Sequence, residues 1–402
     1  MNLNNEPTHI YYDLSVFNND TSGYKPVNLK FSETRTGSNL IQHPVNEYFF
    51  SIIRYEMDNL TTPVFIPQHI PGYTDFLIYT FVLETLNQSN EVVNVYKREV
   101  KFLATNPNIP TPDQTQDNTS HEYYFVYDFQ RWIFMVNKTL NDLFNDIPAG
   151  EKTGTAMCPF FQYDPITGLV SLYTSVEYES TDNDCGCNKK INLYWNSPTD
   201  TVFKGFDTTE ILQADCLRID DNAIDNNVYP PPPPLPPSKY YKVNIINYHN
   251  KNITLLKVND LTNIPYITLI QSYPSFPMLN PIQNIVFTTS GSLPVYNEYT
   301  SYPEFYSTTG DITAGNTSYI TPILTDFIVP LEKGTEYHTK IYYYPTVYRL
   351  VDLKGNQPLK NVDLQVYWKS KIDAKLHPFL LGSQCGASIK ILFRHKSFDN
   401  VN

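Results

Sequence analysis

Residues 47–57 read EYFFSIIRYEM, a run in which aromatic and aliphatic side chains dominate. Aromatic and β-branched residues favour strands, because their side chains fit the pleated, half-buried surface of a sheet. The run is long enough for a strand that crosses a hydrophobic core. Its one cation, Arg54, must then either reach solvent or meet a partner, for instance at a subunit contact. The run therefore predicts a fold built around β-strands.

The segments on both sides of this run have the same character. The chain of 402 residues holds 32 Tyr, 23 Phe and 31 Pro but only 15 Gly, which is typical of short strands separated by loops. Turn residues separate several strand candidates, as in Asn87–Asn90 and in Asp164–Gly168, which has Pro at its second position and Gly at its end. We predict strands at 11–17, 27–31, 47–57, 76–85, 92–103, 159–163, 169–178, 191–195, 241–248, 254–258, 285–289, 323–329, 340–344, 347–353, 362–368 and 388–394.

One segment departs from the β pattern. Between Asp128 and Ile147 apolar residues recur every three or four positions, which traces one face of a helix. Asp128 is a suitable N-cap, and the Pro148-Ala149-Gly150 sequence is a stop signal. The pattern predicts an amphipathic helix whose apolar face covers one end of a sheet. With the strands, it indicates β-sandwich modules and a single prominent helix.

A proline-rich run gives the clearest boundary signal. The sequence after Tyr229 must be extended polyproline II. We therefore expect an acidic β-rich part at 1–228, a strap at 229–239 and a β-rich part at 240–402, or alternatively one elaborated sandwich built from both parts. The run could also be a docking peptide for an SH3- or WW-type partner. Its residues are Pro230, Pro231, Pro232, Pro233, Pro234, Leu235, Pro236 and Pro237.

The charge is unevenly distributed along the chain. The formal net charge is −12, of which Met1–Tyr229 contributes −16 (14 Lys and Arg against 30 Asp and Glu) and Pro230–Asn402 contributes +4 (15 against 11). An acidic total argues against a dedicated nucleic-acid binder, although the basic end could still face an acidic partner. If a shell enclosed nucleic acid, basic groups would lie inside it. We then expect a basic interior face at Lys390, Arg394 and Lys396, farther inside than the acidic loop at Asp182 and Asp184; the alternative is a solvated face.

The sequence contains no recognisable catalytic motif: G-x-S-x-G, H-E-x-x-H, the Walker loop and G-x-G-x-x-G are all missing. Its eight histidines are scattered singly, and Cys185-Gly-Cys187 has no second pair to complete a zinc site. We therefore expect no enzyme activity, no cofactor and no metal. No apolar run reaches the length of a membrane span, and MNLNNEPTHI lacks the basic start and apolar core of a signal peptide. We expect neither membrane insertion nor signal-directed secretion.

Several segments, taken in order, resemble a family of capsid proteins. They are YYDLSVFNND (11–20), KFSETRTG (30–37), YFFSIIRYEMDNLTTPVFIP (48–67), FMVNKTL (134–140), PFFQYDPITGLVSLYTS (159–175), ILTDF (323–327), YYYPTVYRLVDLKGNQPLKNVDLQVYW (342–368) and SIKILFRHK (388–396). Together they resemble the penton and minor capsid proteins of the polinton, adintovirus and virophage group of small DNA viruses. The patterns extend over most of the chain, but none of them is a diagnostic signature.

The resemblance implies a fold and a role. The fold would be all-β, with antiparallel jelly-roll-type β-sandwich modules, long loops and one amphipathic helix near 128–147. The role would be a structural virus capsid protein of penton or minor capsid type, located in the virion and self-assembling into an icosahedral shell. Its partners would be further copies of the chain, as in a pentamer, other capsid proteins, and the genome through the basic C-terminal part. The alternative is a carbohydrate- or receptor-binding β-sandwich attachment protein, because Tyr and Trp on loops can stack on sugars.

Overall fold

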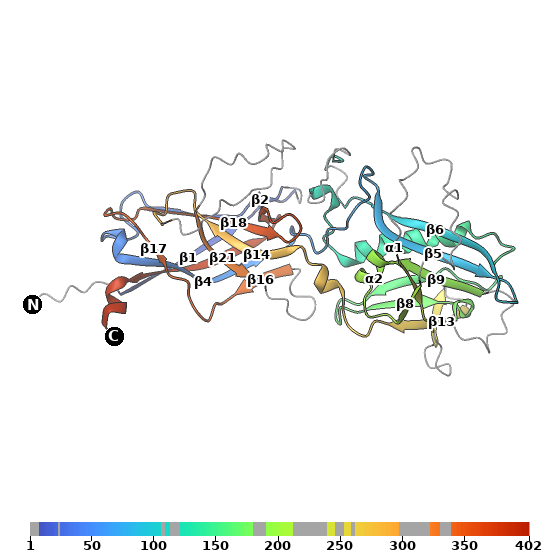
Figure 1. Cartoon of the computed structure of the whole chain (residues 1–402). Coiled ribbons are helices and arrows are strands. Elements are labelled where there is room, and N and C mark those ends of the chain that lie inside the picture. The colour runs from blue at the N-terminus through green and yellow to red at the C-terminus, as the bar shows by residue number, and fades with distance from the viewer. Residues whose placement is uncertain are drawn as a thin grey trace, which may run out of the picture. The chain divides into compact units, whose positions relative to one another are not determined.

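The computed structural model describes residues 8–22, 25–105, 109–112, 121–179, 190–211, 239–245, 253–258, 262–296, 322–329 and 339–401. These residues form two compact units (Figure 1). Unit 1 combines Met1–Thr62 with Pro281–Asn402, and unit 2 is the intervening Pro63–Asn280. The two ends of the chain therefore fold together.

The described strands of unit 1 form two five-stranded antiparallel sheets and one two-stranded pair. Figure 1 shows blue strands from the start of the chain beside red strands from its end. The β4 sheet has the order β1 (His9–Phe17), β21 (Gly386–His395), β4 (Tyr48–Asp58) and β16 (Lys340–Tyr343), with β17 (Val351–Asp352) also on β4. The β18 sheet has the order β15 (Ile323–Ile328), β14 (Ile282–Thr288), β18 (Asn361–Ser370) and β19 (Leu376–Pro378), with β3 (Lys30–Thr34) also on β18. The remaining elements are the pair β2 (Val27–Asn28) and β20 (Leu380–Leu381) and the 3-10 turns η1 (Val45–Glu47) and η6 (Lys396–Val401).

The core of unit 1 lies between these two sheets. Strand β18 shows the period-two pattern of a half-buried strand, with its inward side chains buried and the intervening ones partly exposed. Aromatic contacts join the sheets: the ring of Tyr55 on β4 lies 5.4 Å from that of Phe287 on β14 and 5.1 Å from that of Phe327 on β15. Unit 1 is therefore an antiparallel β-sandwich closed by aromatic side chains.

Unit 2 also contains two described sheets. The β5 sheet has the order β10 (Thr208–Ile211), β11 (Tyr240–Val243), β9 (Lys190–Asn196), β5 (Phe76–Leu86) and β6 (Val92–Lys101). The β8 sheet has the order β12 (Ile253–Val258), β13 (Thr262–Ile270), β8 (Val170–Thr174) and β7 (Phe160–Tyr163). Its described helices are α1 (Phe129–Asp146) and α2 (Ser197–Val202), with 3-10 turns η2 (Glu122–Tyr124), η3 (Val176–Tyr178) and η5 (Phe276–Leu279).

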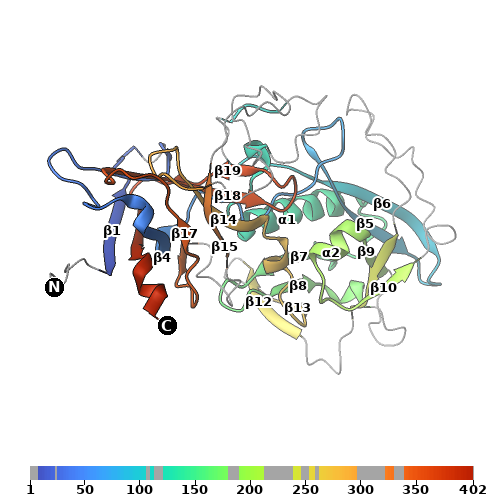
Figure 2. The ribbon, with the colours of Figure 1, turned by 60° about the vertical axis from the view of Figure 1, so that its left-hand side comes forward.

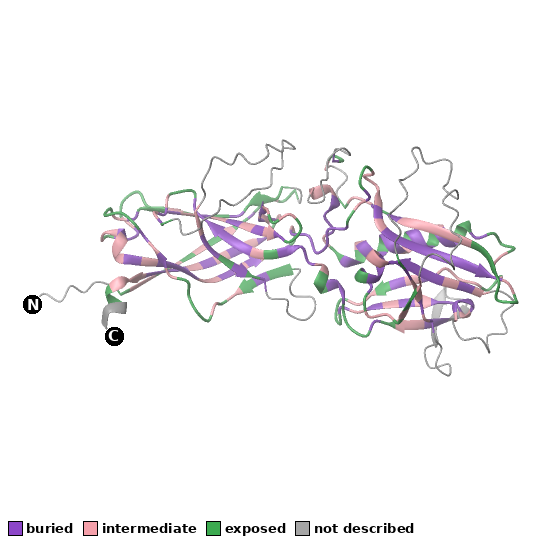
Figure 3. Cartoon of the chain, in the orientation of Figure 1, coloured by how far each residue is buried: buried purple, intermediate pink, exposed green. Residues whose placement is uncertain are grey.

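An aromatic cluster forms the centre of unit 2. Phe161 from β7 stacks on Phe203 with ring centroids 4.5 Å apart, and Trp195 from β9 lies 6.1 Å from the same Phe203. Phe81 from β5 completes the cluster, and Figure 3 shows the strands of this region largely buried. Because its members come from both sheets, the cluster holds the two sheets together.

Helix α1 confirms the predicted helix almost to the residue. The Asp128 side chain accepts a hydrogen bond of 2.8 Å from the Gln130 backbone N–H, which makes it the N-cap. The apolar face of α1 is buried, with Trp132 in contact with the rings of Phe65 and Tyr79. Figure 2 shows α1 alongside β5 and β6, and an ion pair of 2.6 Å joins Arg98 of β6 to Asp146, the last residue of α1. The apolar face of α1 therefore covers the β5 sheet, as the sequence indicates.

The chain divides at other positions than those expected. Strand β1 pairs with β21 along its whole length, so the segments 1–228 and 240–402 share one sheet. The proline-rich run lies outside the described residues, but the strands on either side of it do not. Ile211 of β10 and Tyr240 of β11 are register partners in one antiparallel pair, within unit 2. The run therefore connects neighbouring strands, which contradicts its expected role as a strap between two domains.

Most predicted strands are present, with three informative differences. The β5–β6 and β7–β8 hairpins form at the predicted turns, and Gly168 has the positive φ of 71° that its turn requires. The predicted strand 169–178 ends at Thr174, where η3 follows, and the predicted strand 347–353 is reduced to Val351–Asp352. Strands β10, β13, β19 and β20 were not predicted.

Candidate functional site

The three basic residues predicted to line an interior all lie on β21 or directly after it. Lys390 is on β21, opposite Asp13 of β1 and Arg54 of β4 in the strand register. Both cations bind the same carboxylate: Lys390 Nζ lies 3.3 Å and an Arg54 guanidinium nitrogen 3.2 Å from Asp13. Arg54 therefore has an acidic partner within its own chain. The three neighbouring residues Arg54, Lys390 and Asp13 together carry two positive charges and one negative charge.

Arg394 and Lys396 continue along the same part of unit 1. Lys396 Nζ binds Asp352 at 2.7 Å and lies 5.1 Å from the centre of the Phe49 ring. The Arg394 guanidinium lies 4.7 Å from the centre of the Phe398 ring. The structure thus places the three predicted residues along one strand and its extension, but Lys390 and Lys396 each already bind an acid. Asp182 and Asp184, the acidic loop used for comparison, lie outside the described residues.

The two units differ strongly in net charge. Unit 1 contains 15 Lys and Arg and 17 Asp and Glu, a net charge of −2, whereas unit 2 contains 14 and 24, a net charge of −10. The acidity of the chain therefore belongs to unit 2. The contrast first seen between chain halves is really a contrast between units, because the acidic first 62 residues pair with the basic end.

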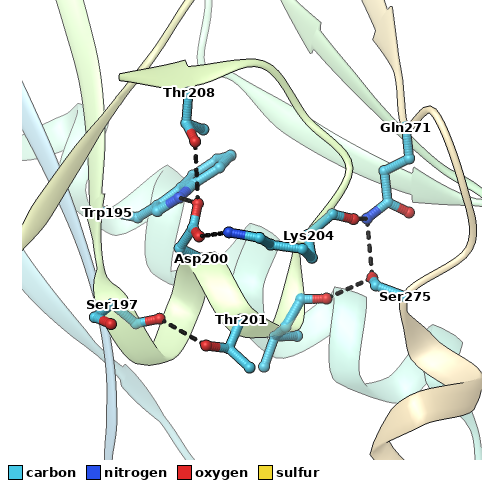
Figure 4. A network of polar contacts seen from close by, with 9 residues as sticks. Trp195, Ser197, Asp200, Thr201, Lys204, Thr208, Gln271 and Ser275 are labelled. Atoms are coloured by element: carbon cyan, nitrogen blue, oxygen red, sulfur yellow. Dashed lines mark hydrogen bonds and ion pairs between the residues drawn. The ribbon is translucent and has the colours of Figure 1, made fainter. Parts of the chain in front are cut away.

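Many polar side chains meet around Asp200, as they do in a functional site, but their hydrogen bonds connect neighbouring structural elements (Figure 4). Asp200 of α2 is 4% exposed, and its carboxylate accepts hydrogen bonds from Trp195 Nε1 (3.2 Å), Thr208 Oγ1 (3.2 Å) and Lys204 Nζ (2.8 Å). The hydrogen bond to Asp200 raises the pKa of Lys204, so the lysine stays charged at neutral pH.

The network continues through an amide and a hydroxyl. Gln271 Nε2 donates to the carbonyl of Lys204 (2.8 Å) and to Ser275 Oγ (3.0 Å), which donates to the carbonyl of Val202 (2.6 Å). These bonds link α2 to β9, to β10 and to the loop after β13. Each polar group named here already binds a neighbour, so the network holds elements together.

A loop at one side of unit 1 exposes apolar side chains that a lone subunit leaves in water. Strands β16 and β17 both pair with β4, but residues 344–350 between them leave the sheet. Val347 is 83% exposed, and Arg349 ties the loop to β15 by a 3.9 Å contact with Asp326. Large exposed apolar residues lie on this loop, on β16 and at the end of β15: Ile328, Tyr342, Tyr344, Val347 and Tyr348. We call these five residues the β16 loop patch; large exposed apolar residues are candidates for a protein contact.

The structural findings on metal sites, thiols and membrane-spanning helices hold only for the residues that the structure describes. Within the described ranges there is no group of three or more His, Cys, Asp and Glu side chains that could hold a metal ion. Cys158 and Cys385 are free thiols, and burial raises the pKa of Cys158 to about 12, which makes it a poor nucleophile. No helix in the described part of the chain is long and apolar enough to cross a membrane. Cys185, Cys187, Cys216 and the run Pro230–Pro237 lie outside that part.

Comparisons with known proteins converge on viral capsids. The family model of the Sputnik minor capsid protein V18/19 matches residues 10–395. The "Uncharacterized protein V18" of Sputnik virophage is 28% identical over 161 residues, which are 39% of this chain and 92% of that protein. The family match spans both units.

Two solved structures share the fold. A chain of the Sputnik virophage structure matches with a TM-score of 0.73 and 24% identity, over 98% of this chain and 99% of that one. The mavirus penton protein matches with a TM-score of 0.57 and 17% identity, over 96% and 99%. These likenesses confirm the all-β, jelly-roll-type architecture. The chain belongs to the family of the Sputnik minor capsid protein V18/19, and it is a structural protein of a virus capsid.

Proposed function

We propose that this chain is a penton-type minor capsid protein that assembles into a pentamer at the vertices of an icosahedral shell. The observation that carries the proposal is the family match over nearly the whole chain, supported by the likeness to the mavirus penton protein. The β16 loop patch supplies what self-association needs, because aromatic and aliphatic groups at the centre of an interface contribute most of its energy. We assign this patch to the contact with a second copy of the chain.

The pentamer is tested by the mass of the purified full chain in solution. Sedimentation equilibrium at rising protein concentration should show a single assembled species whose mass is five times that of the chain. A closed ring of five is expected because a head-to-tail contact repeated by rotation produces a ring. A mass that corresponds to a dimer or trimer at every concentration would rule out the penton assignment while leaving a capsid role intact.

We also propose that the surface of unit 1 with Lys390, Arg394 and Lys396 faces the particle interior and the genome. The support is the net charge of unit 1, which is much less negative than that of unit 2, since phosphate repels the more acidic unit more strongly. The acid partners of Lys390 and Lys396 weaken this attraction, so we expect a modest contact that salt can screen.

Charge reversal at these three positions tests the interior assignment. Particles built from a Lys390→Glu, Arg394→Glu, Lys396→Glu variant should retain less genome, because each substitution adds repulsion to the phosphates. Circular dichroism of the isolated variant checks that the fold survives the loss of the pairs with Asp13 and Asp352. The matched control reverses Lys360, Lys369 and Lys371, which lie outside the β4 sheet. Normal packaging by the first variant would mean that the three residues form only a solvated face.

A further inference from the structure

Strand β1 forms an open edge of the β4 sheet. All nine of its residues are register partners of β21, and no strand in the described part of the chain pairs with its other side. In an antiparallel pair, every second residue directs its backbone N–H and C=O away from the partner strand. Figure 2 shows β1 at the margin of unit 1. Strand β1 therefore has a row of backbone donors and acceptors that no described strand uses.

The sequence of β1 lacks the usual protection of an exposed edge. Soluble proteins protect edge strands with Lys, Pro, a β-bulge or a very short strand. Strand β1 reads HIYYDLSVF, has neither Lys nor Pro, and pairs with β21 without a register shift. Its one acid, Asp13, is bound across the sheet by Lys390 and Arg54. By contrast, β6 at the edge of the β5 sheet carries KREVK at 97–101. The comparison with β6 indicates that the β1 edge is covered when the protein assembles.

The exposed side chains of β1 include two large aromatic residues on one face. Along most of β1 partly buried and exposed residues alternate, and the exposed ones include Tyr11 (56%) and Phe17 (60%). The His9 ring stacks on that of Tyr11 at 6.3 Å and meets the ring of Phe398, which is 48% exposed, edge-on at 4.9 Å. These contacts join Tyr11, His9 and Phe398 into one aromatic surface, and Phe17 lies six residues farther along the same face. We call these four residues the β1 edge patch.

The order of the strands places this patch opposite the β16 loop patch. A head-to-tail ring joins two different surfaces of the chain, because each copy presents one surface to the neighbour on one side and another to the neighbour on the other side. The β16 loop patch lies at the β16 edge of the β4 sheet and extends onto β15, whose Phe327 contacts Tyr343 of β16 at 5.1 Å. Strand β1 is the other edge of the same sheet, with β21 and β4 between. The two patches therefore occupy opposite edges of one sheet, as the two contacts of a ring member require.

We propose that the β1 edge patch receives the β16 loop patch of the next copy in the ring. The inference rests on the proposed self-assembly and names the second half of its contact. The three tyrosines of the β16 loop patch then pack against the aromatic rings of the β1 edge patch, and the outward backbone groups of β1 bind the main chain of the incoming loop. Asp13, between Tyr11 and Phe17, enters the contact with its charge already paired. The surface proposed to face the genome lies on and after the neighbouring strand β21 and borders this contact.

Aspartate substitutions on β1 test its part in the contact. Tyr11→Asp and Phe17→Asp each change a side chain that is more than half exposed, so the isolated chain should stay folded, which circular dichroism checks. Each should raise the dissociation constant of the assembly by at least about 30-fold, as the loss of a central aromatic residue does. The matched control is Ile372→Asp in the turn between β18 and β19, an exposed apolar residue outside both patches. Ile372→Asp should assemble like wild type.

Mixing two variants identifies the surface that β1 meets. Tyr11→Asp keeps an intact β16 loop patch, and Val347→Asp keeps an intact β1 edge patch, so an equimolar mixture contains one undamaged combination of surfaces. Each variant alone should sediment as a monomer. The mixture should form a species of twice the mass of the chain, which cannot grow because both of its free ends carry the added aspartate. Sedimentation equilibrium above the concentration at which wild type assembles measures this, and Phe17→Asp replaces Tyr11→Asp if the latter fails to fold.

Two results would overturn this inference and leave the proposed pentamer intact. Wild-type assembly by both β1 variants would remove β1 from the contact. A mixture that stays monomeric at every concentration would show that the two patches do not meet. A wild-type ring of another size has a different meaning: it would rule out the penton assignment, whereas a dimer in the mixture would still support the pairing of the two patches.

Discussion

Replacing Val347 with aspartate should leave the chain folded and prevent it from assembling. Val347 is 83% exposed in the isolated subunit, so a charged side chain costs the monomer almost nothing. In the assembled ring the same carboxylate would be buried against the apolar groups of a neighbouring copy without a partner, which is strongly unfavourable. We expect the dissociation constant of the assembly to rise about 100-fold or more, as at a central interface position.

A matched control separates this effect from a general consequence of added charge. Ile166 in the turn between β7 and β8 is also 83% exposed, but it belongs to unit 2 and lies outside the β16 loop patch. Ile166→Asp should therefore sediment like wild type, whereas Val347→Asp should sediment as a monomer. Wild-type assembly by Val347→Asp would remove the β16 loop patch from the subunit contact.

Replacing Trp195 with alanine should destabilise unit 2 by about 3–5 kcal/mol, the usual cost of truncating a large buried aromatic residue. Trp195 is completely buried and contacts Phe81, Phe161 and Phe203, which come from both sheets and the end of α2. The substitution also removes the N–H that binds the buried carboxylate of Asp200. Urea unfolding followed by tyrosine and tryptophan fluorescence measures the change.

The variant Trp195→Phe distinguishes packing from hydrogen bonding. It keeps most of the aromatic volume but loses the donor to Asp200, so we expect a smaller loss, about 1–2 kcal/mol. If Trp195→Ala and Trp195→Phe lost equal free energies of unfolding, the hydrogen bond to Asp200, and not the aromatic cluster, would hold α2 and β9 together.

The local elements of this fold are readable from the sequence because their signals are local. The residues that set α1, its spacing of apolar positions and the Asp128 cap, lie within one segment, and so do the turns at Asn87–Asn90 and Asp164–Gly168. Strand β13 escaped prediction because Pro265 interrupts its pattern. Pro265 is opposite Leu255 of β12, but β8 pairs only with Ile267–Ile270, so this position needs no second ladder bond.

The division into units could not be predicted, because it depends on pairing between segments far apart in the chain. The proline run at 230–237 is the strongest local break, yet Ile211 and Tyr240 on either side of it are neighbours in one sheet. No local signal indicates that β1 pairs with β21, more than 360 residues away. For the same reason, the sequence assigns the charge contrast to the two chain halves, whereas it belongs to the two units.

The candidate surfaces could not be predicted either, because they also depend on contacts between segments far apart in the chain. Lys390, Arg394 and Lys396 stand out in sequence as a basic run, but their acidic partners Asp13 and Asp352 come from other strands. Apart from Ile328, the β16 loop patch lies in YYYPTVYRL (342–350), of which 342–344 and 347–350 are predicted as parts of two strands because their residues are aromatic and β-branched. Pro345 was the available signal that the chain leaves the sheet there.

Electron microscopy of the purified full chain tests the central claim, that the chain is a capsid protein built to associate with itself. At high protein concentration the account predicts ring-shaped particles with fivefold symmetry, in which the β16 loop patch of each copy meets a neighbour. A strictly monodisperse monomer at every concentration, with no rings and no incorporation into shells, would contradict it.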